Sequence, residues 1–202
     1  MASSKDNLLT YQLIAGCSAI LYSSIVLLVL IMPLYYLEGA VKGFISFSFY
    51  QLKMGDTLIK LPELERAISL SIPITLNSLF LLLLGLNSVT YWIYRKHSPV
   101  LARLMFPTSM ATVFSTTFFY MTHTVYILKV VESLTGEYVV TNSAGILILG
   151  EVILKSSPLA DMMISPTPFL SLSILNAVLS TMWILRIYTK LSSQSIRNRD
   201  QK

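Results

Sequence analysis

Hydrophobic residues gather into four long runs along this chain, separated by segments of mixed character. The hydrocarbon core of a bilayer is roughly 30 Å thick and needs roughly 20 apolar residues to cross it as a helix. A chain inside lipid must satisfy its own backbone hydrogen bonds, so such runs have to be helical. The pattern therefore predicts an all-α membrane protein, a bundle of four transmembrane helices at residues 8–34, 72–93, 106–131 and 169–188.

The segment 38–70 has a different period. Ile45, Phe47 and Phe49 alternate with polar or amphipathic residues, which is typical of a strand with one buried face. A turn, a returning strand and a short helical start are then predicted at residues 54–57, 58–61 and 62–66.

The segment 132–167 also has the composition of a sheet. It predicts a strand at 137–141, a turn at 142–145 and a second strand from 146 to 149, which a bulge at Gly150 extends towards residue 154. A re-entrant element at 146–154 is the alternative, although it is too short to span a membrane. Because a single hairpin is only marginally stable, we expect the two segments to pair into one small sheet.

Charge gives these elements an orientation. The turn between the second and third runs carries Arg95, Lys96 and Arg103 and no acidic residue, and short loops of this kind stay in the cytoplasm. Both termini are then cytoplasmic, and residues 189–202 form a basic tail whose serine content suggests disorder. In this topology the cytoplasmic side carries nine basic and two acidic residues, and the outer side carries six basic and eight acidic residues. Topology thus accounts for the net charge of +5, and no nucleic-acid partner is expected.

Two absences bear on the compartment. Cys17 is the only cysteine, and the chain has no Asn-x-Ser/Thr acceptor site for glycosylation. Together they favour a prokaryotic plasma membrane. The first run is longer than the apolar region of a signal peptide, so we expect it to be an uncleaved anchor.

Four helices with two β-rich loops on one side are similar to the tetraspan plan of the claudins. The first-loop signature of that family, Trp…Gly-Leu-Trp…Cys…Cys, does not occur in this sequence. The resemblance concerns architecture alone and implies no site residue.

Few residues suggest chemistry. There is no glycine-rich phosphate loop, no cysteine pair and no His-Glu-x-x-His motif, and the centres of the runs carry no charge, so neither an enzyme nor a cofactor is indicated. Four neutral polar residues of the runs remain as ligand-binding candidates: Asn77, His123, Tyr126 and Asn176. They serve either as interhelical hydrogen-bonding groups or as a pocket for a quinone or lipid. A haem ligand is a third interpretation, but it requires a second histidine, and His97 lies at the opposite leaflet.

Small residues recur every fourth position in three of the runs, which lets helices approach closely in lipid. These stripes serve packing within the chain or contact with another subunit. They are Ala15, Ala19 and Ser23; Thr108, Thr112 and Thr116; and Ser173, Ala177 and Thr181.

The apolar outer strands suggest a contact surface, because exposed apolar patches mark partner sites. The residues expected there are Phe44, Phe47, Phe49, Ile146 and Ile148. The leading hypothesis is a non-enzymatic structural or accessory subunit of a plasma-membrane assembly. Its partners would be membrane lipids and other subunits or further copies of itself. The alternative is a quinone- or lipid-binding subunit of a redox or transport complex.

Overall fold

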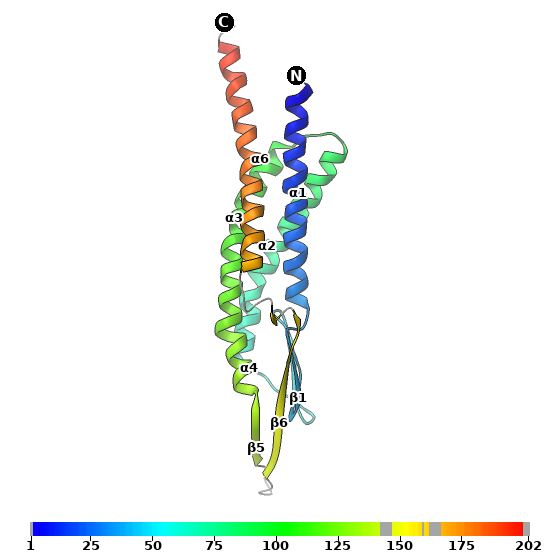
Figure 1. Ribbon diagram of the computed structural model, residues 1–202, viewed down its shortest axis with the longest axis vertical. Helices are drawn as coiled ribbons and strands as arrows, with labels where there is room; N and C mark the ends of the chain where they lie inside the picture. The colour runs from blue at the N-terminus through cyan, green and yellow to red at the C-terminus, as the bar shows by residue number, and fades with distance from the viewer. Residues whose placement is uncertain (1, 142–146, 159, 162–166, 200–202) are drawn as a thin grey trace. The chain divides into compact units, whose positions relative to one another are not determined.

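The computed structural model describes residues 2–141, 147–158, 160–161 and 167–199. Side chains are described for residues 7–136, 150–158, 160–161 and 167–192. The chain is mostly helical, with one small antiparallel sheet (Figure 1). Its helices are α1 (Ala2–Ile31), α2 (Pro62–Ile93), α3 (Pro99–Thr122), the π-helix η1 (His123–Leu128), α4 (Lys129–Leu134) and α6 (Thr167–Arg199).

Three of these helices are long and apolar enough to cross a membrane. The qualifying stretches are Asn7–Ile31 in α1, Pro62–Ile93 in α2 and Thr167–Ser192 in α6. Helix α3 is not among them, because threonine and serine recur along it and dilute its apolar character.

Several helix boundaries differ from the predicted ones. Helix α2 begins at Pro62 rather than at residue 72, so the predicted short helix and the apolar run form one helix with Pro73 inside it. Helix α3 begins at Pro99 rather than at 106. Helix α6 continues to Arg199, so the prediction of a disordered tail is wrong over this stretch. Serine is only a mildly unfavourable helix residue, and good helix formers surround it there.

The chain divides into two compact units. The first comprises Met1–Ile25, Leu76–Thr116 and Phe169–Lys202, and the second comprises Val26–Thr75 and Thr117–Pro168.

Helices α1 and α2 pack closely in the first unit. A Cβ atom on Gly85 would lie 2.9 Å from the carbonyl oxygen of Gly16, and one on Gly16 would lie 3.0 Å from Cβ of Ser88. Eight of the nine residues in the three predicted stripes are buried in this unit, and Thr181 is half-buried. The stripes therefore pack within the chain.

Gln12 holds the ends of these helices together. Its fully buried side chain donates from Nε2 to the carbonyl oxygens of Ser88 (3.0 Å) and Lys96 (3.2 Å). Its Oε1 accepts from the N–H of Ser98 (3.3 Å), and Ser88 Oγ donates to the Gln12 carbonyl oxygen (3.0 Å). One amide thus fixes the end of α2 and the turn that leads into α3.

That turn closes α2 with a residue in the left-handed region. Arg95 has a φ of 54°. Its N–H donates to the carbonyl oxygen of Trp92 (2.9 Å), and the N–H of Lys96 donates to that of Tyr91 (2.9 Å). This is the Schellman pattern, whose left-handed position usually holds glycine.

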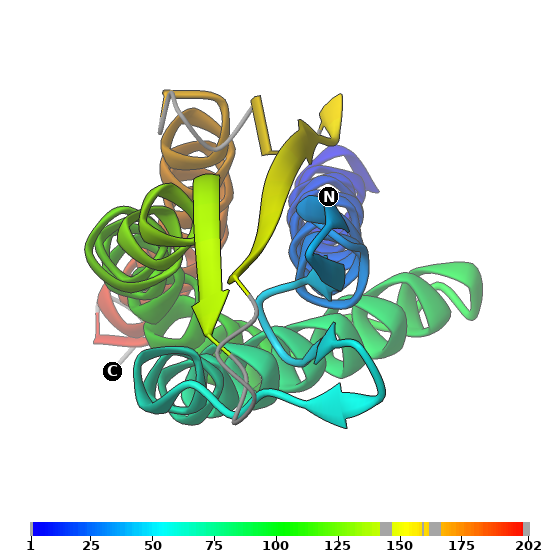
Figure 2. The same ribbon diagram turned by 90° about the horizontal axis from the view of Figure 1, so that it is seen from below.

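The second unit contains a six-stranded antiparallel sheet of order β4-β3-β2-β1-β6-β5. The strands are β1 (Tyr35–Gly39), β2 (Val41–Ile45), β3 (Tyr50–Met54), β4 (Thr57–Leu58), β5 (Gly136–Thr141) and β6 (Leu147–Ser156). Figure 2 shows β5 (lime) beside β6 (yellow). Strand β6 also pairs with β1, from Tyr35↔Ser156 to Gly39↔Val152. The prediction that the two segments form one sheet is confirmed.

Within this sheet several predicted positions are wrong. Phe47 and Phe49 lie between β2 and β3 rather than on a strand, because both the N–H and Oγ of Ser46 donate to the carbonyl oxygen of Phe49 (2.9 and 2.6 Å) and bend the chain there. The predicted returning strand is reduced to β4. Helix α1 ends at Ile31 rather than at residue 34, and Tyr35 and Tyr36 begin β1.

Gly150 does not form the predicted bulge. Strand β6 continues through it in unbroken register, with Tyr138↔Gly150 between Glu137↔Glu151 and Val139↔Leu149. A Cβ atom on Gly150 would lie 2.4 Å from Cβ of Ala40, so the glycine makes room for that neighbour. The predicted turn at 142–145 lies outside the described residues.

We expect Gln12→Leu to destabilise the protein by about 1–3 kcal/mol, because it leaves buried backbone groups unpaired. The matched control is Asn87→Leu, which removes an exposed amide bonded only within its own helix, to the carbonyl oxygen of Leu83. Thermal unfolding in detergent measures both, and an equal effect of the two substitutions would contradict a clamp at Gln12.

Candidate functional site

His123 is the first residue of η1 and is almost fully buried in the second unit. A π-helical turn inserted between α-helical stretches is rare and is frequently found at functional sites. Its widened backbone runs from His123 to Leu128 and carries both His123 and Tyr126. We therefore take this turn as the centre of the candidate site.

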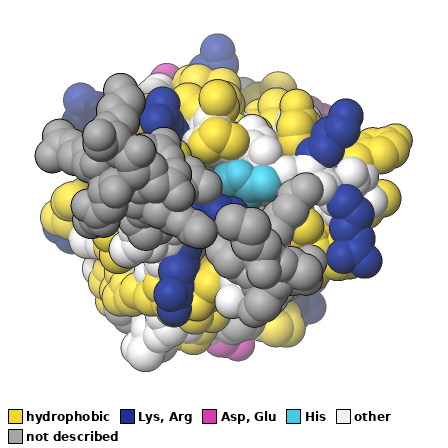
Figure 3. Space-filling view, turned by 90° about the horizontal axis from the view of Figure 1, so that it is seen from above, with side chains coloured by type: hydrophobic (Ala, Val, Ile, Leu, Met, Phe, Trp, Pro, Cys, Tyr) yellow, Lys and Arg dark blue, Asp and Glu magenta, His cyan; other side chains and the backbone are white. Residues whose placement is uncertain are grey.

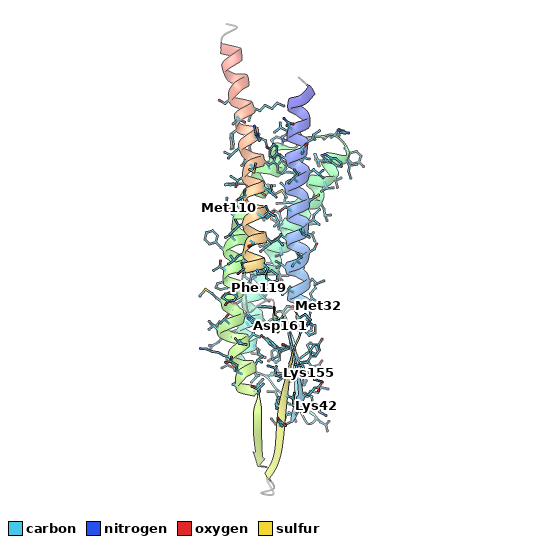
Figure 4. All side chains as sticks on the ribbon, in the orientation of Figure 1. Met32, Lys42, Met110, Phe119, Lys155 and Asp161 are labelled. Atoms are coloured by element: carbon cyan, nitrogen blue, oxygen red, sulfur yellow. The ribbon has the colours of Figure 1, made fainter. Side chains whose placement is uncertain are left out.

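Two aromatic rings contact the His123 ring, and a third stacks on one of them. The Nε2 of His123 lies 2.9 Å from Oη of Tyr35 on β1, and the two rings are nearly parallel with centroids 5.9 Å apart. Phe47, from the turn after β2, stacks on Phe119 of α3 at 3.8 Å and lies 5.8 Å from the His123 ring. Phe119 is labelled in Figure 4. The turn is held by Ser48, whose Oγ donates to the carbonyl oxygen of Leu30.

The polar atoms of this cluster are only partly satisfied. Burial raises the pKa of the Tyr35 phenol, and the carboxylates of Asp161 and Glu132 raise it further, so Tyr35 remains a neutral hydroxyl. His123 Nδ1 is buried and has no hydrogen-bond partner among the residues whose side chains are described. The pair thus offers one free imidazole nitrogen inside an aromatic enclosure.

The four residues predicted for a ligand site have separate surroundings. Asn176, in the first unit, is buried and accepts at Oδ1 from Ser18 Oγ (3.4 Å), which links α6 to α1. Asn77 is half-buried in the first unit, and its Nδ2, like that of Asn176, has no partner within the described part of the chain. His123 and Tyr126 belong to the second unit.

Tyr126 lies between two open grooves of the second unit, of about 460 and 290 Å³. Each groove is lined by residues at the start of α2 and by residues of η1 or α4. Sequence reasoning selected Tyr126 as a neighbour of His123 and missed the charged residues across from it. These charged residues lie far from Tyr126 in the sequence, so nothing in the sequence indicated that they line the same grooves.

The residues predicted for the contact surface differ in their exposure. Phe47 is fully buried, whereas Phe49 is 40% exposed and Phe44 is half-buried against it, edge to face at 5.5 Å. Ile148 lies on β6 opposite Val140, and its side chain is not among those that the structure describes. Ile146 lies outside the described residues.

His97 belongs to the basic turn of the first unit. The indole Nε1 of buried Trp183 donates to His97 Nε2 (3.4 Å). Burial lowers the pKa of His97, and nearby Lys190 lowers it further. Figure 3 shows Lys and Arg side chains (dark blue) around this end of the molecule, with a histidine (cyan) among them.

Among described residues no three His, Cys, Asp or Glu side chains gather in a way that could hold a metal ion. No protein-family model matches the chain, and no curated protein matches it significantly. The function is therefore argued from the chemistry of these sites.

We expect stability to fall as the pH drops below the ordinary histidine pKa of 6.5. Because the folded chain lowers the pKa of His97, it holds this ring neutral, and protonation of the unfolded chain then favours unfolding. Protonation also removes the acceptor for Trp183. Thermal unfolding between pH 8 and 5 should show a loss in the wild type that is smaller in His97→Gln. An identical loss in both would contradict this role.

We expect His123→Leu to cost about 1–3 kcal/mol, because Tyr35 loses its buried partner, and to cost clearly less in a Tyr35→Phe background. His123→Gln should be milder, since an amide can replace one hydrogen bond. Unfolding of the four proteins of this double-mutant cycle gives the coupling, and a coupling of zero would contradict the pair. An absorption spectrum of each purified protein tests whether His123 instead binds a cofactor. A cofactor present in the wild type and absent only from the His123 variants would show that His123 is its ligand.

Proposed function

We propose that this chain is a four-helix plasma-membrane protein without enzymatic activity, which acts as a structural or accessory subunit of a membrane assembly. Its partner surface is an exposed aromatic cluster at one part of the sheet. Three helices have the length and composition to cross a bilayer. The proposal requires α3, with η1 and α4, to be the fourth crossing.

Two features of α3 support a membrane position. Its polar side chains bond within the first unit: Thr116 Oγ1 lies 2.7 Å from Tyr22 Oη, and Ser109 Oγ lies 2.8 Å from Ser180 Oγ. Its exposed side chains include Phe114, at 78% exposure, and Met110. A helix that satisfies its hydroxyls inside a bundle and exposes apolar groups suits lipid.

The orientation rests on the basic turn after α2. Arg95 and Lys96 lie there, and the left-handed conformation of Arg95 costs roughly 1–2 kcal/mol relative to glycine. An arginine at a position where glycine would be less strained suggests that its positive charge has a role. Positively charged loops favour the cytoplasmic side of a membrane. The sheet then lies outside the cell.

One observation carries the contact surface: an aromatic cluster of Tyr36, Phe44 and Phe49 is left partly exposed on one face of the sheet. Tyr36 and Phe44 are directly opposed on β1 and β2, and Phe49 packs against Phe44. The other face, with residues such as Leu37, Ile45 and Leu52, is buried. Aromatic residues are enriched at the centres of protein interfaces.

Polar groups surround this aromatic cluster. Lys155 pairs with Glu38 (2.7 Å), and Lys42 lies further along β2. Both lysines extend from the sheet in Figure 4. An apolar centre with a charged rim is the usual arrangement of a protein interface.

The competing explanation is a membrane anchor. Tyr36 follows closely after the apolar stretch that ends at Ile31, and aromatic residues are enriched where helices leave the bilayer. The nature of the adducts formed at the aromatic cluster distinguishes the two.

We expect a benzophenone amino acid at position 49 to give discrete protein adducts on irradiation of native membranes. The matched control is position 58, because Leu58 is an exposed apolar residue of β4 outside the aromatic cluster. Adducts of twice the chain mass would identify a second copy as the partner, and other masses would identify a different subunit.

Adducts to lipid alone at position 49, or equal protein adducts at 49 and 58, would contradict the contact surface. Orientation is checked in a Cys17→Ala background with an impermeant maleimide. A cysteine at Gln51 should react in intact cells, and one at Ser98 only after permeabilisation. The reverse result would overturn the topology.

A lipid- or quinone-binding role is the second candidate, and the grooves beside Tyr126 favour it. They combine charged and apolar residues at the start of α2. This combination suits an amphiphile.

A further inference from the structure

Two open grooves of the second unit share Tyr126 and together form what we call the Tyr126 site. The larger groove is lined by Pro62, Glu65, Arg66, Ser69, Leu70 and Tyr126. The smaller adds residues of both signs from α2 and α4, Glu63 and Lys129. Each groove therefore carries one carboxylate and one cation.

These four charges have no ion-pair partners among the residues whose side chains are described. The one ion pair in that part of the chain joins Lys155 to Glu38. Glu63, Glu65, Arg66 and Lys129 are all exposed, and no described side chain pairs with any of them. Two opposite charges in each groove thus remain available to a ligand.

Apart from Tyr126 and one serine in each groove, the remaining lining is apolar. Leu70 lines the larger groove, and Val125 and Val130 line the smaller. Leu70 is followed in α2 by the exposed apolar residue Ile72. In the orientation proposed above, the charges lie at the level of the outer headgroups, and Leu70 and Ile72 lie at the start of the hydrocarbon.

We propose that the Tyr126 site binds a zwitterionic glycerophospholipid of the outer leaflet, and this inference rests on the membrane orientation of the proposed function. The phosphate lies against Arg66 and Lys129, whose N–H groups donate to it. The ammonium lies against Glu63 and Glu65 and over the ring of Tyr126, which attracts cations. One acyl chain runs from Leu70 along α2.

Charge complementarity selects this lipid class over two others. An anionic lipid offers no cation to the two carboxylates, which then lie beside its phosphate and repel it. An uncharged diacylglycerol leaves all four charges unpaired. A headgroup with one charge of each sign can pair its phosphate with the two cations and its ammonium with the two carboxylates.

The test titrates the purified full chain in detergent with phosphatidylethanolamine, phosphatidylglycerol or diacylglycerol, and counts bound lipids by native mass spectrometry. The wild type should retain phosphatidylethanolamine best. The double variant Arg66→Gln/Lys129→Gln should bind it about tenfold more weakly or worse, the factor expected for one lost charge-assisted hydrogen bond. The matched control, Lys53→Gln/Arg103→Gln, removes an exposed lysine of β3 and an exposed arginine of α3, both outside the grooves, and should change nothing.

Glu63→Gln/Glu65→Gln provides the sharper result, because it should reverse the preference and make phosphatidylglycerol the better ligand. Both glutamates lie in the first turn of α2, so circular dichroism must show that this variant is folded. Should it not fold, Tyr126→Leu replaces it, and it should weaken phosphatidylethanolamine binding while leaving diacylglycerol binding unchanged.

The proposal would be overturned if the wild type preferred phosphatidylglycerol or bound all three lipids equally. It would also be overturned if Arg66→Gln/Lys129→Gln and its matched control lost phosphatidylethanolamine binding equally, or if the folded glutamate variant bound both phospholipids equally more weakly. Competition by soluble phosphoethanolamine as strong as by the lipid would also overturn it, because the acyl chain would then contribute nothing. The measurement needs no partner subunit. A negative result therefore leaves the cross-linking test of the proposed function intact, and the converse also holds.

Discussion

The pairing of β1 with β6 is the interaction on which the second unit depends. It joins Tyr35–Gly39 to Val152–Ser156, and the N–H of Ser157 continues the contact to the carbonyl oxygen of Leu34 (2.8 Å). Without it, β1–β4 and the hairpin β5–β6 would be separate small sheets, and a lone hairpin is marginal in water. The same register turns Tyr35 to the buried face, where it meets His123, and Tyr36 to the exposed one. A slip of one residue would exchange them, so the buried pair and the aromatic cluster depend on a single alignment.

Much of this architecture follows from the sequence, because long apolar runs and turn residues act locally. The four helices and the single sheet were predictable on that basis. Strand β1 was not, because a Tyr-Tyr pair directly after an apolar run has the composition of an interfacial belt. The turn at Phe47 was missed for a related reason. Its alternation fits a strand, but Ser46 bonds to the backbone of Phe49 and ends the ladder.

The sites were less predictable than the fold, since they depend on partners far apart in the chain. The buried amide of Gln12 bonds to groups 76 to 86 positions away, and nothing near it in the sequence indicates them. His123 and Tyr126 were identified as polar residues within an apolar run, yet their environments come from β1 and from the start of α2. The π-helical turn that carries both has no sequence pattern of its own.

Buried polar pairs and the exposed groups of the second unit have different roles, and this difference separates stability from binding. In the first unit, buried polar groups pair between helices, as in Tyr22 with Thr116, Ser109 with Ser180 and Ser18 with Asn176. Lipid supplies no hydrophobic force between helices, so such bonds and close approach at Gly16 and Gly85 have to hold a membrane bundle together. In the second unit, the charges beside Tyr126 and the exposed aromatic cluster contribute little to packing. Substitutions at the first set should therefore act on folding, and substitutions at the second on what the protein binds.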